Sequence, residues 1–262
     1  MKVYGFQINP AWEDKEENFK KIEKLASSVE ILPKSLLVMP ECFATGFSLN
    51  TDVTSSEEPQ KSLQFLKNIA LKNDSWVIAG IIQNVKGNTY NRALCIEPNG
   101  QVLPAYDKIH PISLLKENTV HMPGNEIRTW PLGSFHASPF ICYDLRFPEV
   151  FRAAMVKDVN LFIVIACWPT ARMKHWKKLI QARAIENLSY VIGINRTGND
   201  PDHEFSGNSM VVGPQGNILA ESGDQETVLE TEILLDDVFA WRKQFPVLDD
   251  ISNKFLPDIS YS

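Results

Sequence analysis

Residues 161–168 read LFIVIACW and form the longest apolar run of the sequence. The run shows no alternation of apolar and polar residues, so both faces of a strand at Leu161–Ala166 should be covered by other parts of the protein. Eight residues are too few to cross a bilayer, which takes about 20 residues in a helix. The run therefore predicts a fully buried strand rather than a membrane segment.

Strand-like and helix-like segments alternate along the rest of the chain. Three turn sequences, KGN at 86–88, PNG at 98–100 and PQG at 214–216, each lie between apolar segments and predict β-hairpins. Hairpins combined with fully buried strands and intervening helices favour two sheets packed face to face, with helices outside, over one doubly wound sheet. Strands are predicted at 2–8, 35–40, 76–83, 93–96, 102–105, 139–143, 161–166, 190–195, 209–212, 218–220 and 228–233, and helices at 12–29, around 63–70, and at 148–156, 173–188 and 235–242.

Composition narrows the class of protein. The 262 residues are 44% hydrophobic and 22% charged, without linker or repeat, which is typical of a single globular domain. The net charge of −6 disfavours nucleic acid as a partner, because binding to phosphate backbones needs a basic face. The four scattered cysteines, and a start without a signal peptide, favour reduced thiols in the cytoplasm. No metal-binding spacing, P-loop, G-x-G-x-x-G or G-x-S-x-G motif occurs, so neither a metal nor a cofactor is expected.

Three polar residues with catalytic potential follow predicted strands. Cys142 precedes a helix whose positive end would favour a thiolate, although a cysteine in such a place is more often a small apolar core residue. Glu41 alone would be a turn acceptor, and Lys108 alone would be a solvated surface residue. Strand ends in layered α/β folds meet at one rim, where thiol, carboxylate and lysine would act as nucleophile, base and oxyanion stabiliser in acyl transfer.

Segments around these residues resemble the signatures of the nitrilase superfamily of carbon–nitrogen hydrolases. They are MPE at 39–41, YDKIH at 106–110 and ICYDLRFPE at 141–149, followed by QARAIEN at 181–187 with Asn195-Arg196. The resemblance runs from about Met1 to Asp249 and implies an α/β fold, a four-layer α-β-β-α sandwich. It assigns residues 1–250 to one carbon–nitrogen hydrolase domain and 251–262 to a C-terminal tail. It also implies a homodimer and a catalytic triad of Glu41, Lys108 and Cys142, with Glu117 as a second glutamate.

Within the superfamily the chain most resembles bacterial ω-amidases of the YafV type. The matching segments are MPECFATGFS at 39–48, Trp168-Pro169 with Arg172 and His175-Trp176, and WRKQFP at 241–246. The resemblance implies a small-molecule substrate, a short α-keto dicarboxylic acid monoamide such as α-ketoglutaramate or α-ketosuccinamate, which loses ammonia from its ω-amide. The chain departs from the pattern at Pro111-Ile112, where Leu-Phe is usual, and at Cys167, where Asn is usual.

A pocket for this substrate needs a cation or several donors for the buried carboxylate. Arg172 is the first candidate, and Trp168, Phe43 and Phe47 are candidate walls. Arg146, which is close to Cys142 in sequence, is a second candidate, but a structural pair with Glu149 is the favoured expectation for it.

The expected mechanism is covalent and passes through a thioester. Glu41 takes the thiol proton of Cys142, and Lys108 and the backbone N–H of Tyr143 hold the oxyanion. Three alternatives stay open: another carbon–nitrogen hydrolase acting on a different amide, a carbamoyl compound or a nitrile; a Cys-His hydrolase using His110 or His136; and an inactive binding protein on the same fold.

Overall fold

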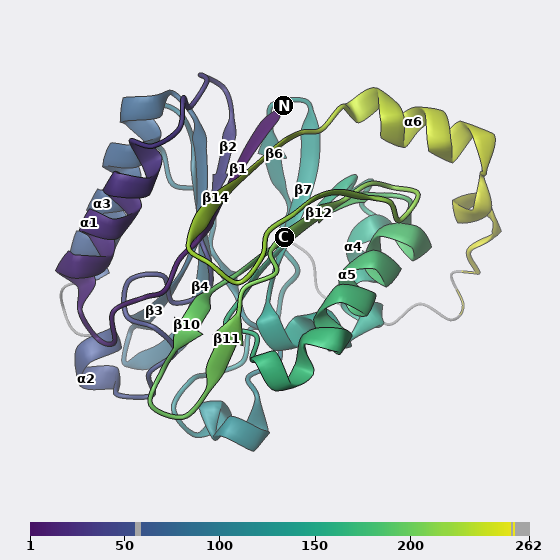
Figure 1. The fold of residues 1–262 in the computed structure, drawn as a ribbon. Helices are drawn as coiled ribbons and strands as arrows, with labels where there is room; N and C mark the ends of the chain where they lie inside the picture. The colour runs from purple at the N-terminus through teal and green to yellow at the C-terminus, as the bar shows by residue number, and fades with distance from the viewer. Residues whose placement is uncertain (56–58, 253, 255–262) are drawn as a thin grey trace.

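The structure is a computed structural model that describes residues 1–55, 59–252 and 254. Two six-stranded sheets lie face to face, and helices cover their outer surfaces (Figure 1). The expected α-β-β-α sandwich, built from a single domain, is confirmed. Of the predicted tail at 251–262, only residues 251, 252 and 254 are described, and the rest lies outside the described residues.

The first sheet has the strand order β14-β1-β2-β3-β4-β5. β1 pairs in parallel with β2 and β2 with β3, whereas β14, β4 and β5 pair antiparallel to their neighbours. The predicted hairpin at 86–88 therefore joins β3 to β4. The strand bounds are β1 (Lys2–Gln7), β2 (Leu36–Val38), β3 (Trp76–Val85), β4 (Asn88–Ile96), β5 (Tyr106–Asp107) and β14 (Thr227–Glu232).

The second sheet has the strand order β13-β12-β9-β8-β7-β6. β7, β8 and β9 run parallel to one another, and every residue of β8 and β9 is buried, as the unbroken apolar run predicts. A separate two-stranded ribbon, β10 with β11, was not expected from the sequence. The bounds are β6 (Trp130–Leu132), β7 (Phe135–Ile141), β8 (Leu161–Ala166), β9 (Tyr190–Asn195), β10 (Thr197–Asn199), β11 (Glu204–Ser206), β12 (Met210–Val212) and β13 (Ile218–Glu221).

The helices form the two outer layers. On the first sheet, Phe19 and Ile22 of α1 and Leu66 and Ile69 of α3 are buried against the strands. On the second sheet, apolar side chains of α4 and α5 are buried in the other core cluster. The bounds are α1 (Lys15–Ala26), α2 (Thr51–Thr54), α3 (Pro59–Asn73), α4 (Pro148–Met155), α5 (Met173–Asn187) and α6 (Leu235–Gln244), with 3-10 turns η1 (Ser113–Leu115), η2 (Glu117–Thr119), η3 (Cys142–Arg146), η4 (Thr170–Arg172) and η5 (Val247–Asp250). Among the described residues, no helix has both the length and the apolar character that crossing a membrane would take.

Local sequence explains where several elements begin and end. α1 begins at Lys15 rather than at residue 12, because the side chain of Asp14 caps it by accepting a hydrogen bond from the Glu17 N–H at 3.0 Å. The strand predicted at 139–143 ends at Ile141, and Cys142 opens the 3-10 turn η3 instead of continuing the strand. This difference sets the position of the thiol, as described below.

Candidate active site

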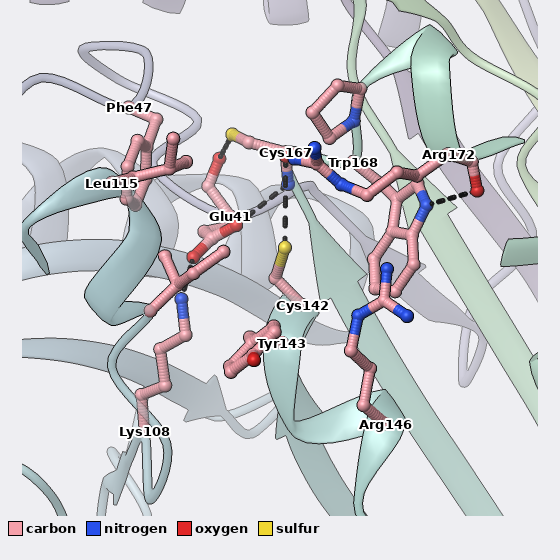
Figure 2. A pocket seen from close by; sticks show the side chains of 12 residues that line it. Glu41, Phe47, Lys108, Leu115, Cys142, Tyr143, Arg146, Cys167, Trp168 and Arg172 are labelled. Carbon is pink, nitrogen blue, oxygen red and sulfur yellow. Dashed lines mark hydrogen bonds and ion pairs between the residues drawn. The ribbon is translucent and has the colours of Figure 1, made fainter. Parts of the chain in front are cut away.

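The ends of strands from both sheets meet at one pocket (Figure 2). Glu41 lies three residues after β2, Lys108 directly after β5, Cys142 directly after β7 and Cys167 directly after β8. The space within and at the mouth of the pocket is about 350 Å³, which includes open solvent. Its lining residues are Glu41, Phe47, Lys108, Ile112, Leu115, Cys142, Tyr143, Arg146, Cys167, Trp168, Pro169 and Arg172.

The carboxylate of Glu41 is fully buried and receives hydrogen bonds from three sides. Its Oε1 accepts from Lys108 Nζ at 2.9 Å and from Asn91 Nδ2 at 2.7 Å. Its Oε2 accepts from the backbone N–H of Cys167 at 2.7 Å. Glu41 therefore holds one orientation beside the thiol of Cys142, in contact with both sheets.

Lys108 and Glu117 form a second buried ion pair next to the first. Lys108 Nζ lies 2.9 Å from Glu117 Oε2 and 3.1 Å from Glu117 Oε1. Burial alone would lower the pKa of Lys108, but the charges of Glu117 and Glu41 raise it well above its ordinary value. Burial would likewise raise the pKa of Glu117, but the charge of Lys108 and hydrogen bonds from His121, Lys108 and Asn91 lower it to about 2. Lys108 is therefore a permanent cation. Glu117 does not line the pocket and contacts Lys108 Nζ from the side away from it.

Cys142 occupies a tight turn at the end of β7. Its backbone is left-handed, with φ +47°, a conformation that costs a non-glycine residue free energy and persists only where the surroundings enforce it. The buried carboxylate of Asp144 supplies this restraint, because its Oδ2 accepts from the Ile141 N–H at 3.0 Å and from the Tyr106 hydroxyl at 2.8 Å. The turn directs the Cys142 thiol towards the carbonyl oxygen of Cys167, 3.7 Å away.

The thiol of Cys142 is protonated in the resting site. Burial and the charge of Glu41 raise the pKa of Cys142 well above its ordinary value, although Lys108 acts in the opposite direction. The sequence favoured a thiolate on the assumption of a helix N-terminus, whereas a 3-10 turn follows Cys142 and burial dominates. A base is therefore required at the moment of attack, and the Glu41 carboxylate lies beside the thiol (Figure 2).

Two arginines line the pocket on the side of Trp168, opposite Phe47 and Leu115 (Figure 2). The guanidinium of Arg146 lies 4.7 Å from the centre of the Trp168 ring. Burial and the charge of Arg172 lower the pKa of Arg146. Among the described residues, neither arginine has an ion pair with a carboxylate. The expectation that Arg146 pairs with Glu149 is therefore wrong, and Arg146 belongs to the pocket.

Phe43 is not placed where the sequence suggested. It is fully buried behind the first sheet, with ring centres 6.1 Å from those of both Phe19 and Phe65, and it does not line the pocket. Phe47 does line the pocket, and Lys108 Nζ lies 5.5 Å from the centre of its ring. The backbone is left-handed at Cys42, between Glu41 and Phe43, with φ +50°, and again at Gly46, between Phe43 and Phe47, with φ +70°. The first of these turns directs Phe43 into the core.

Two groups at the site were not found from the sequence. Asn91 of β4 donates to both Glu41 and Glu117, but it lies outside the strand predicted at 93–96. Its signal would have been a buried polar residue within a longer strand. Cys167 was noted only as a departure, yet its N–H, carbonyl and thiol all contact Glu41 or Cys142.

The assembled groups suit acyl transfer. A thiol, a carboxylate and a buried ammonium lie together, with backbone N–H groups of a tight turn beside them. In the described part of the chain, no group of three or more His, Cys, Asp or Glu side chains is arranged to hold a metal ion.

The sequence and the structure were both found to be similar to those of known carbon–nitrogen hydrolases. The family model for carbon–nitrogen hydrolases matches residues 5–243. The chain is 37% identical to the 2-oxoglutaramate amidase of Bacillus subtilis (strain 168), over 90% of this chain and 91% of that protein. It is 33% identical to the omega-amidase YafV of Yersinia enterocolitica, over 98% of each. Its structure matches that of a CN-hydrolase superfamily protein of Xanthomonas campestris with an arsenic adduct in the active site, with a TM-score of 0.91 and 28% identity over 97% of each chain.

Proposed function

The chain belongs to the carbon–nitrogen hydrolase family of the nitrilase superfamily, as its sequence signatures indicate, and we propose that it is a cysteine-dependent ω-amidase. The proposed substrate is a short α-keto dicarboxylic acid monoamide, α-ketoglutaramate or α-ketosuccinamate. The observation that carries the proposal is the pair of arginines without a carboxylate partner, in the described residues, beside the Cys142 thiol. The name of the Bacillus relative supports the same substrate class.

The reaction begins with a proton transfer. Glu41 accepts the proton of the Cys142 thiol, and the sulfur attacks the amide carbonyl carbon. Lys108 and the backbone N–H of Tyr143 hold the tetrahedral oxyanion, where one such donor contributes about 3 kcal/mol to lowering the barrier. Glu41 then gives the proton to the amide nitrogen, so that the C–N bond breaks and ammonia leaves a thioester on Cys142.

Hydrolysis of the thioester reverses the proton flow. Glu41 takes a proton from water, the resulting hydroxide attacks the thioester carbonyl, and the proton returns to the sulfur as the acid departs. One carboxylate serves both halves because the two halves are mirror images in proton transfer. Glu117 acts through Lys108, which it holds in place from behind.

The far end of the substrate meets the arginines. Two neighbouring guanidinium groups repel one another, so a carboxylate between them relieves repulsion as well as forming charge-assisted hydrogen bonds. The α-ammonium group of glutamine or asparagine would add a cation beside Arg172 and Arg146. The keto acid amides should therefore be preferred over glutamine and asparagine by a factor on the order of 100.

Ammonia release from α-ketoglutaramate, α-ketosuccinamate, glutamine, asparagine and a simple nitrile tests the proposal. Arg172→Ala should lower kcat/KM for the keto acid amides and leave slow hydrolysis of a neutral amide nearly unchanged. Lys174→Ala, which removes the same charge from an exposed site two residues away, is the matched control and should behave as the wild type. Equal rates on glutamine and its keto analogue, or loss of both activities in Arg172→Ala, would refute the substrate and leave only a general amidase. A homodimer and a cytoplasmic location remain predictions from the sequence.

A further inference from the structure

We propose that Asn91 is a positioning residue of this site, whose side-chain amide holds the Glu41 and Glu117 carboxylates at a fixed separation and stabilises both in their ionised form. The inference rests on the proposed role of Glu41 as the base. It does not depend on the identity of the amide substrate.

Asn91 contacts all three charged groups behind the thiol. Its Nδ2 donates to Glu41 Oε1 at 2.7 Å and to Glu117 Oε1 at 2.9 Å. Its backbone carbonyl accepts from the Lys108 N–H at 2.9 Å. The same two Oε1 atoms also accept from Lys108 Nζ, so an amide nitrogen and an ammonium nitrogen bridge them as a closed ring. An amide NH₂ group has two hydrogens, and both are used here.

The orientation of the Asn91 amide follows from its neighbours. The reversed amide would place Oδ1 at hydrogen-bond distance from two carboxylate oxygens, with no hydrogen between them. In the orientation observed, Oδ1 is buried and has no hydrogen-bond partner among the described residues. This orientation directs both amide hydrogens at the two carboxylates.

The charge balance explains why these hydrogens matter. The cluster of Glu41, Glu117, Lys108 and Asn91 is at most 1% exposed and contains two carboxylates but one ammonium. Two carboxylates at such close range ordinarily share a proton unless other donors stabilise the second charge. Asn91 supplies such a donor to each of them. Its hydrogen bond is one of the causes that lower the pKa of Glu117.

Asn91→Asp removes this hydrogen-bond donation and changes the size of the side chain very little. The variant replaces a double donor with a third carboxylate, so the cluster binds a proton more readily and the Cys142 proton leaves less readily. Besides Glu41, Lys108 and Glu117 themselves, the titratable groups that face the cluster are His121, Cys42, Cys142 and Cys167. The acidic limb of the activity profile should therefore move to higher pH.

The test follows two profiles against pH in full-length protein: kcat/KM for α-ketoglutaramate, and the rate at which iodoacetamide alkylates Cys142. In Asn91→Asp, both should move to higher pH by about one unit or more. Asn91→Leu, which loses both donors without adding charge, should move them in the same direction by less. The control is Asn187→Asp, because Asn187 is equally buried and also has an unpaired Oδ1, but donates only to the backbone carbonyl of Arg183. Asn187→Asp should change stability and leave both profiles in place.

The outcomes are distinct. Profiles of Asn91→Asp that coincide with the wild type, or a shift of equal size in Asn187→Asp, would overturn the inference. If Asn91→Asp does not fold, Asn91→Leu decides the question by the same two profiles. If no amide is hydrolysed by any form of the protein but the alkylation profile still moves, the substrate proposal fails and the role of Asn91 stands.

Discussion

Replacing Gly80 by alanine should displace the proposed base without touching the substrate. Gly80 lies on β3, where the segment that carries Glu41 crosses the strand at close range. The Gly80 N–H donates to the Pro40 carbonyl at 3.2 Å, and the Gly80 carbonyl accepts from the Phe43 N–H at 3.2 Å. The position of Glu41 along the sheet is therefore set by main-chain contact with this glycine.

The structure gives the size of the displacement. A Cβ on Gly80 would lie 2.6 Å from Glu41 Cα and 3.0 Å from the Cys42 nitrogen. Ordinary contact begins at 3.4 Å, so the backbones at Gly80 and Glu41 must separate by about 0.8 Å more. A misplacement of about 1 Å in a catalytic group can cost on the order of 100-fold in rate. The added methyl group should cost about 1–3 kcal/mol in stability through overpacking, which a protein with an ordinary unfolding free energy of roughly 5–15 kcal/mol survives.

Steady-state kinetics on α-ketoglutaramate, with circular dichroism to confirm folding, measures the effect. Gly80→Ala should lower kcat by one to two orders of magnitude, with KM changed little, because the arginines proposed to bind the carboxylate lie in the 3-10 turns η3 and η4, which follow strands of the other sheet. Gly223→Ala is the control, since no atom lies within 4 Å of the added Cβ. A folded Gly80→Ala enzyme with wild-type kcat would show that contact with β3 does not set the position of Glu41 that the reaction needs.

Two further changes test the thiol and the buried acid. Cys142→Ala should abolish both turnover and alkylation at the site. Cys95→Ala, which alters a core position of β4, is the control and should retain both. Turnover by Cys142→Ala would refute the covalent mechanism. Because the pKa of Glu117 is lowered to about 2, its ionised carboxylate stabilises the folded protein at pH values above the ordinary carboxyl pKa of 4.5. This stabilisation is lost as the pH falls from 4.5 towards 2. The free energy of unfolding, measured with urea, should therefore fall by about 2 kcal/mol more between pH 5 and pH 3 in the wild type than in Glu117→Gln. Equal losses in the two proteins would refute the lowered pKa.

The sequence predicts best the segments whose burial is uniform. Leu161–Ala166 and Tyr190–Asn195 form strands with the bounds expected, because an unbroken apolar run can only be satisfied with both faces covered. The ribbon of β10 (Thr197–Asn199) and β11 (Glu204–Ser206) was missed. Its strands have three residues each and mixed burial, so they leave no periodic signal.

The site shows what local sequence cannot specify. The spacing of Arg146 and Glu149 fits a helical i, i+3 pair, but Arg146 ends η3, and Phe147 between them is extended with φ −108° and ψ 91°. The left-handed backbone at Cys142 depends on Asp144, which is itself held by Tyr106 from the other sheet. Such contacts between sheets fix the direction of side chains and are not encoded by neighbouring residues.

The buried charges also indicate why a protonated thiol is compatible with attack. Adding a net charge to a buried cluster costs several kcal/mol per ion, so a site that had to gain a charge to form a thiolate would be penalised. When the proton of Cys142 passes to Glu41, the net charge is unchanged, since one carboxylate is neutralised as one thiolate appears. Lys108 contacts Glu41 directly, and its charge also favours an ionised Cys142, so the same cation can stabilise the negative charge before and after the transfer. The oxyanion that follows is a third location for the same charge, which is why a fixed ammonium, held from behind by Glu117, suits every step of the proposed cycle.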